Sequence, residues 1–286
     1  MERPYLFYEP TKRAPSAPLV ILLHGSRQTP EDLRRATGYA FERLADQHGF
    51  IAVYPQGYKR RWNDCRAGGR YAARRLQLDD VGFLAAIVEQ LQSADGVDPT
   101  RVFLAGYSAG GQLAFRVALE HPELVAAIAA FSANLPTDDN LACKPVGTSV
   151  PVMLINGTRD RINPYEGGRV SVFGFASRGT VRSAPASAGY FAALAGLATP
   201  ERRQLAESGQ SRVEQWRWFE RGTPEVVLLA VHGGGHVVPG PLAVFPRILG
   251  TVSDVLDGPR EVWQFFARQP TSAERTSLLE SRDAPL

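Results

Sequence analysis

The 286-residue chain has few cysteines and no long hydrophobic run. Its two cysteines, Cys65 and Cys143, are too few for a disulfide scaffold, and they could form one disulfide or remain buried thiols. No apolar stretch approaches the ~20 residues that span a bilayer, so we expect no membrane span. The first residues carry no apolar signal segment. The compartment therefore stays open, because the protein either remains inside the cell or has lost a signal.

Lysine is also scarce, with three residues against 29 arginines, at a net charge of +3. The arginines are scattered along the chain in single positions and short pairs, which is typical of a solvated surface. We therefore expect no nucleic-acid partner. The chain has no P-loop, no dinucleotide fingerprint and no His/Cys cluster with metal-ligand spacing, so we expect neither a cofactor nor a metal.

Apolar runs alternate with amphipathic ones along most of the chain. The run at 18–23 is almost wholly apolar, as in a strand covered on both faces. Thr29 and Pro30 then open a helix predicted over 30–47. Further strands are expected at 50–54, 101–105, 124–130 and 151–156, with helices at 80–92 and 112–120. This alternation predicts an α/β protein with a mostly parallel, doubly wound sheet.

The predicted organisation is one α/β domain over residues 1–268. Between 161 and 211 the regular periodicity fades and Gly, Ser and Ala are frequent, which suggests a cap or lid inserted over the sheet edge. Strands at 213–219 and 226–231 and a helix at 261–268 complete the domain. The polar tail at 269–286 is expected to fray.

The most informative segment is the run GYSAGG at 106–111, between a predicted strand and a predicted helix. Ser108 has glycines two residues before and two residues after it, which matches the nucleophile elbow of hydrolases. The turn is so tight that side chains at Gly106 and Gly110 would meet neighbouring backbone. This context predicts Ser108 as a catalytic nucleophile.

A serine nucleophile needs a histidine base, and the chain has five histidines. His48 and His121 end helices, where a cation suits the helix dipole, so a structural role is favoured. His24 ends the first apolar run and is expected to brace the loop after it. His232 terminates the last strand, whereas His236 follows three glycines in the loop beyond it. We therefore predict His236 as the base.

The acid that orients the histidine should follow a strand between the serine and the histidine. Asp160 lies in the turn after the strand at 151–156 and is the predicted acid. Asp138 and Asp139 are rivals, but their Pro-Thr-Asp-Asp-Asn segment reads as a simple turn.

Acyl transfer also needs donors for the developing oxyanion. The backbone N–H of Ala109, directly after the serine, is one predicted donor. The second is expected in the loop after His24-Gly25, from Ser26 or, next best, from Arg27.

Seven motifs in order then link the chain to a known family. They are LVILLHG (19–25), YPQG (54–57), WNDC (62–65), DDVGFL (79–84), RVFLAGYSAGG (101–111), VPVMLINGTRDRINPYEGG (150–168) and GGGH (233–236). Together they resemble the polyhydroxybutyrate depolymerase and feruloyl esterase group of the α/β-hydrolases. The resemblance implies an α/β-hydrolase fold and an esterase, secreted or in the envelope in many relatives, for hydroxyalkanoate or hydroxycinnamoyl esters.

The chain departs from that group after His236. Relatives usually read Gly-His-Thr-Trp-Pro-Gly, whereas here Val237-Val238-Pro239-Gly240 follows and the Trp is missing. The loop after Gly25 has Ser26 where many relatives carry Cys, which leaves a backbone donor intact. The specific ester, whether hydroxyalkanoate, hydroxycinnamoyl or simple acyl, stays open.

Three aromatic residues are candidates for substrate contact. Trp62 and Tyr165 are predicted walls of the pocket, because flat aromatics give a large contact area at low entropy cost, and Tyr107 adjoins the serine. For Trp62, simple packing in the core is an equal alternative.

The function predicted from these residues is a cofactor-free serine carboxylester hydrolase working through an acyl-enzyme. Its partner is a small or oligomeric ester, and its oligomeric state stays open. One alternative is a prolyl-oligopeptidase-like peptidase, suggested by the extra glycine Gly111. A non-catalytic binding protein with a hydrolase fold is the other.

Overall fold

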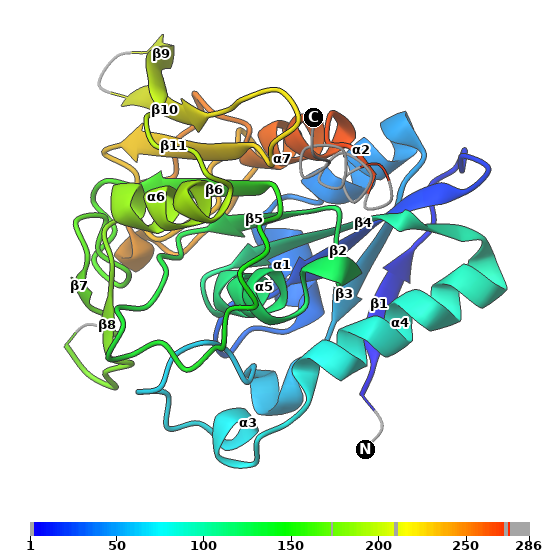
Figure 1. Cartoon of the computed structure of the whole chain (residues 1–286), viewed down its shortest axis with the longest axis horizontal. Helices are drawn as coiled ribbons and strands as arrows, with labels where there is room; N and C mark the ends of the chain where they lie inside the picture. The colour runs from blue at the N-terminus through cyan, green and yellow to red at the C-terminus, as the bar shows by residue number, and fades with distance from the viewer. Residues whose placement is uncertain (1–2, 173, 209–210, 272–273, 275–286) are drawn as a thin grey trace, which may run out of the picture.

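A nine-stranded sheet runs through the molecule, in the order β1-β3-β2-β4-β5-β6-β11-β10-β9 (Figure 1). This computed structural model describes residues 3–172, 174–208, 211–271 and 274. The central strands from β3 to β11 are parallel, and β1, β10 and β9 join antiparallel at the two edges. Along the chain, the strands of this sheet are β1 (Tyr5–Tyr8), β2 (Ala17–Leu23), β3 (Ile51–Pro55), β4 (Val97–Tyr107), β5 (Ala127–Phe131), β6 (Val152–Gly157), β9 (Glu201–Ser208), β10 (Ser211–Trp218) and β11 (Val226–His232). The predicted α/β fold class is confirmed.

Helices cover both faces of the sheet. In β2, Leu19 and Ile21 point into one buried cluster, and Val20 and Leu22 into the other. This two-sided burial explains why the strand reads as a continuous apolar run. The first cluster is covered by α4 (Asp80–Asp95), α5 (Ala109–Glu120) and α6 (Ala184–Leu194), and the second by α1 (Pro30–Ala36), α2 (Ala40–His48) and α7 (Gly258–Ala267). A short helix, α3 (Ala72–Arg75), precedes α4.

The single helix predicted over 30–47 is wrong, because the structure divides it into α1 and α2. Thr29 caps α1 as expected, with a complete capping box. Gly38 and Tyr39 then adopt left-handed backbone angles, with φ of 60° and 58°. A side chain at Gly38 would collide with the carbonyl of Leu242, and the N–H of Val244 donates to the Ala36 carbonyl at 2.8 Å. A distant loop thus occupies the break, which the helical periodicity does not reveal.

The segment 161–211, expected as a cap or lid, divides into unlike parts. Its first part forms a short hairpin of β7 (Gly168–Arg169) and β8 (Thr180–Val181). The second part contributes α6, whose residues belong to a core cluster, and β9, which pairs with β10 at the sheet edge. Because α6 is rich in alanine and has no polar face, its sequence shows no helical periodicity.

The division into one domain and a tail stays a prediction, and most of the tail at 269–286 lies outside the described residues. Within the described part of the chain, no helix combines the length and apolar character that crossing a membrane requires.

Candidate active site

Ser108 lies at the turn between β4 and α5, at the carboxyl edge of the parallel strands. Its backbone has φ 53° and ψ −110°, a strained conformation for a residue other than glycine. A side chain at Gly106 would collide with the backbone of Gly110, and one at Gly110 with the Leu23 carbonyl. The glycines are therefore required by close packing, as the elbow pattern predicts. Helix α5 begins directly at Ala109, three residues before the predicted start, so its unpaired first-turn N–H groups lie beside the serine.

A continuous hydrogen-bond chain joins the three predicted residues of the triad. Nε2 of His236 lies 2.9 Å from Oγ of Ser108, and its Nδ1 lies 2.7 Å from Oδ2 of Asp160. The other carboxylate oxygen, Oδ1, accepts the backbone N–H groups of Ile162 and Asn163, each at 2.8 Å. With the carboxylate fixed in this way, His236 donates from Nδ1 and presents Nε2 to accept the serine proton. The structure brings all three residues together.

The loop that carries His236 is held by its backbone. The Tyr107 hydroxyl donates to the His236 carbonyl at 2.7 Å, and the His236 N–H donates to the Leu249 carbonyl at 2.7 Å. A side chain at Gly235 would collide with that same Leu249 carbonyl. The run of glycines before His236 thus permits a close approach of two backbones and fixes the imidazole.

The rival histidine and aspartates lie away from the serine. His232 is partly exposed on β11. Its Nε2 lies 3.6 Å from Oε2 of Glu214, and its Nδ1 lies 3.5 Å from Nη2 of Arg212, both on β10. Asp138 forms an exposed ion pair with Arg182 at 2.5 Å, and the neighbouring aspartate is also exposed. None of these residues lines the cavity beside Ser108 within the described part of the chain.

His24 braces the loop after β2, as expected. Its Nε2 accepts the N–H of Gly57 at 3.0 Å, and its Nδ1 lies 2.8 Å from the Gly25 carbonyl. Burial lowers the pKa of His24 to about 4, so the ring is neutral near pH 7. The Trp62 ring packs against this ring at a tilt of 36°, with centroids 4.7 Å apart, and its Nε1 donates to the His24 carbonyl at 2.9 Å.

The predicted role of Trp62 as a pocket wall is wrong. Its side chain is 0% exposed, and its indole N–H is satisfied by the His24 carbonyl beneath the loop. The alternative of core packing is the one that the structure bears out.

The loop after Gly25 narrows the choice of the second oxyanion donor. The Arg27 N–H donates to the Arg60 carbonyl at 3.0 Å, so this group is already used. Ser26 lines the same cavity as Ser108, and its hydroxyl accepts from Nη1 of Arg178 at 3.1 Å. The geometry therefore favours Ser26 over Arg27.

A cavity of about 690 Å³ opens beside Ser108. Tyr107 lines it, as predicted, together with the apolar side chains of Ile162, Val170, Val172, Phe175, Pro246 and Leu249. Tyr165 is not among its described lining residues, so its predicted role as a wall is wrong. Tyr165 instead packs against a core cluster, and burial raises its pKa to about 12.

The cavity also has arginines, which sequence reasoning missed. Arg27, Arg61, Arg66 and Arg178 line it, although the arginines were expected to form a solvated surface. Arg66 and Arg178 are in fact buried, at 3% and 7% exposure. For Arg61 and Arg66, the sequence offered one signal, which is that they flank the WNDC motif. For Arg178 it offered none, since this residue lies in the segment without periodicity.

Cys65 and Cys143 form a disulfide with their Cα atoms 5.0 Å apart. This resolves the alternative that the sequence left open. The bond ties the segment that carries Arg66 to the segment after β5, and the Cys65 carbonyl also accepts from the N–H of Ala142 at 2.7 Å.

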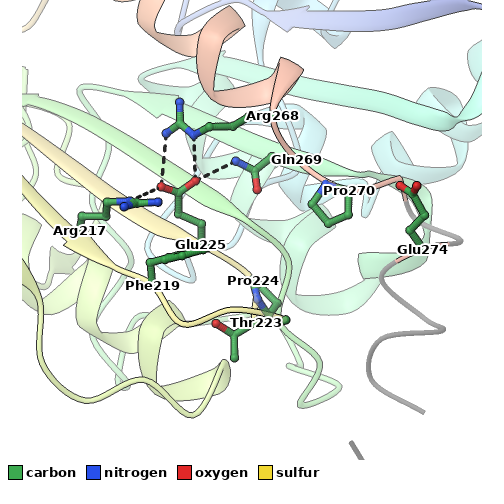
Figure 2. A pocket seen from close by; sticks show the side chains of 10 residues that line it. Arg217, Phe219, Thr223, Pro224, Glu225, Arg268, Gln269, Pro270 and Glu274 are labelled. Carbon is green, nitrogen blue, oxygen red and sulfur yellow. Dashed lines mark hydrogen bonds and ion pairs between the residues drawn. The ribbon is translucent and has the colours of Figure 1, made fainter. Parts of the chain in front are cut away.

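A second cavity, of about 790 Å³, is lined by Glu225, Arg217 and Arg268 (Figure 2). It lies at the amino end of the parallel strands, opposite to the end that carries Ser108. Glu225 precedes the first residue of β11, whereas Ser108 follows the last residue of β4, and the strands from β4 to β11 are parallel. Its carboxylate accepts from Arg217 at 2.6 Å and from Arg268 and Gln269 at 3.0 Å each. Both guanidinium groups here have a carboxylate partner, and the cluster lies at the other end of the strands from the serine, so the candidate site is the cavity beside Ser108.

A mostly parallel sheet with a serine elbow, followed along the chain by an acid and then a histidine, defines the α/β-hydrolase fold. Within that class, the chain belongs to the family described as esterase PHB depolymerase, which matches residues 4–186.

Comparison with individual proteins agrees with this assignment. The chain is 31% identical over 235 residues to NocK of Nocardia uniformis subsp. tsuyamanensis, which is named as an esterase, covering 78% of this chain and 66% of that one. It is 29% identical to a bifunctional acetylxylan esterase/xylanase of Neocallimastix patriciarum, covering 56% of this chain and 22% of that one. The chain thus spans 66% or less of the length of these relatives. An acetyl xylan esterase structure from Aspergillus awamori has the same fold, with a TM-score of 0.57 and 18% identity over 83% of this chain and 90% of that one.

Proposed function

We propose that this chain is a serine carboxylic ester hydrolase that works through an acyl-enzyme. The observation that carries the proposal is the hydrogen-bond chain from Ser108 through His236 to Asp160. Ser108 and His236 line a cavity of about 690 Å³ that can receive a substrate. Membership of an esterase family supports the same reaction class.

In the first half of the reaction, Oγ of Ser108 attacks the ester carbonyl carbon and passes its proton to Nε2 of His236. Asp160 stabilises the imidazolium that forms and keeps the proton on Nδ1 in place. His236 then gives the new proton to the departing alkoxide. The C–O bond to the alcohol breaks, and the acyl group remains on Ser108.

The tetrahedral intermediate carries a negative charge on the former carbonyl oxygen. The backbone N–H groups of Ala109 and Ser26 are the proposed donors, and each such donor contributes about 10²- to 10³-fold in rate. In the second half, His236 takes a proton from water, and the resulting hydroxide attacks the acyl-enzyme. The carboxylic acid leaves and Ser108 recovers its proton.

The two alternatives find less support. A non-catalytic binding protein would have no need of a complete relay with a fully oriented carboxylate. A peptidase of the prolyl-oligopeptidase type is not favoured, because the family and the relatives named above are those of esterases.

The test is the rate of p-nitrophenyl butyrate hydrolysis by Ser108→Ala beside a control, Ser93→Ala, which removes a hydroxyl from an exposed position of α4. We expect Ser108→Ala to lose at least about 10³-fold in kcat with unchanged circular dichroism, and the control to match the wild type. A Ser108→Ala protein that hydrolyses the ester at the wild-type rate would contradict the proposal.

A further inference from the structure

Two arginines face the cavity beside Ser108 without an acidic partner. Arg178 is 7% exposed, and its guanidinium donates to the Ser26 hydroxyl at 3.1 Å. Nη1 of Arg61 is buried and meets no hydrogen-bond acceptor among the described residues. In the same described part of the chain, no carboxylate comes within ion-pair distance of either guanidinium. Buried cationic groups are normally paired, so this arrangement is unusual.

Asp64, the acidic residue whose charge acts on both guanidinium groups, is already engaged. Asp64 forms a buried ion pair with Arg66 at 2.5 Å and accepts from the Tyr71 hydroxyl at 2.5 Å. The Tyr71 ring in turn positions both other guanidinium groups, with Cζ of Arg178 5.5 Å and Cζ of Arg61 5.7 Å from its centroid. Asp64 therefore balances the charge of Arg66, and the charges of Arg61 and Arg178 remain.

Both unbalanced arginines are held where water cannot fully solvate them. Burial, together with the charges of Arg66 and Arg61, lowers the pKa of Arg178 to about 10. Burial and the charge of Arg27 likewise lower the pKa of Arg61. Arg178 is still protonated near pH 7, so the site keeps two positive charges that an anion would stabilise.

A neighbouring cavity of about 690 Å³ extends this positive region. It shares Arg61 and Arg178 with the cavity beside Ser108 and adds Arg70 and Arg169. Neither cavity has an aspartate or glutamate among its described lining residues. The two cavities are therefore lined by guanidinium groups and by apolar side chains, with no described carboxylate.

We propose that Arg61 and Arg178 form a carboxylate-binding subsite beside Ser108, and that the preferred substrates are esters bearing a carboxylate a few bonds from the scissile carbonyl. The inference rests on the proposed function and names its substrate class. Planar guanidinium groups bind carboxylates through paired, charge-assisted hydrogen bonds. The contact of Arg178 with Ser26, a proposed oxyanion donor, places this subsite close to the reacting group.

The test compares monomethyl with dimethyl esters of succinate, glutarate and adipate, which share the scissile bond and differ in one charge. Methanol release gives kcat/KM for each. In the wild type, we expect at least one monomethyl ester to be preferred over its dimethyl counterpart by about 10-fold or more. Arg178→Gln and Arg61→Gln should each lower this ratio by about 10- to 100-fold. The control Arg221→Gln, which removes an exposed charge from the turn between β10 and β11, should keep the wild-type ratio.

Two results would overturn the subsite. One is a wild type that hydrolyses every dimethyl ester at least as well as its monomethyl counterpart. The other is an Arg178→Gln protein in which both esters lose the same factor, because this would make Arg178 a positioning residue for the Ser26 loop.

Binding of the monomethyl esters to Ser108→Ala, measured by calorimetry, separates this inference from the proposed function. Selective binding that is lost on adding Arg178→Gln supports the subsite even if the wild type turns over no ester. Turnover that depends on Ser108 without selectivity for the anion leaves the esterase and removes the subsite.

Discussion

The disulfide between Cys65 and Cys143 should be a major source of stability. It closes a loop with a sequence separation of 78 residues. Replacing both cysteines with alanine removes the cross-link. The substitution changes the side-chain size little at two buried positions, Cys65 at 0% and Cys143 at 7% exposure. The main consequence is that the unfolded chain recovers the conformational freedom of that loop.

The size of the effect follows from the loop length. In the chain-entropy treatment, a loop of 78 residues corresponds to about 15 cal/mol/K, or about 4.5 kcal/mol at 25 °C. With a urea m-value of about 3 kcal/mol/M, the midpoint of unfolding should fall by about 1.5 M.

The assay is urea unfolding of the wild type and of Cys65→Ala/Cys143→Ala, each with and without a reductant. The chain has only these two cysteines, so a reductant can act on no other bond. We expect the reduced wild type to unfold near the midpoint of the variant, and the variant to ignore the reductant. A variant with the wild-type midpoint would refute the reasoning.

Two further predictions concern the site and its support. Asp160→Asn should lower kcat on p-nitrophenyl butyrate by about 10⁴-fold. The backbone N–H groups that bind Oδ1 would hold the amide oxygen, so the NH₂ group would face Nδ1 of His236 and impose the wrong tautomer. A loss of less than tenfold would argue against that orientation. His24 has a folded-state pKa of about 4 against 6.5 in the unfolded chain, so the unfolded chain binds more protons between these values and stability falls as the pH drops. Between pH 7 and pH 5, His24 alone should lower the free energy of unfolding by about 2 kcal/mol. Urea titrations at both pH values should therefore show a smaller decrease for His24→Gln than for the wild type. An equal decrease in the variant would contradict the role of His24.

The geometry of Ser108, Asp160 and His236 could be predicted because chain order fixes it. In a parallel sheet the turns after the strands meet at one edge, so each residue is placed by the strand that it follows. The glycines around Ser108 and before His236 add a local signal, because close backbone contacts require them.

The walls of the cavity could not be predicted in this way. Trp62 and Tyr165 turn into packed regions, and their direction depends on where long loops fold. Arg178 reaches the site from the β7–β8 hairpin, and Arg61 reaches it from the loop after β3. No periodicity in the sequence connects these two segments, so their convergence appears only in three dimensions.

The break at Gly38 has a similar cause. The apolar spacing continues from α1 into α2, and the turn depends on a backbone contact with a loop near Leu242. A contact between residues so far apart in the sequence leaves no local trace beyond the glycine itself.

The most direct test of the central claim is to identify the residue that acts as the nucleophile. The protein is treated with a fluorophosphonate, digested and sequenced by mass spectrometry, alongside Ser108→Ala. The account predicts one phosphonyl group per chain on Ser108, with ester hydrolysis lost in proportion to labelling and no label on Ser108→Ala. A fully active enzyme that carries the label elsewhere, or carries none, would contradict it.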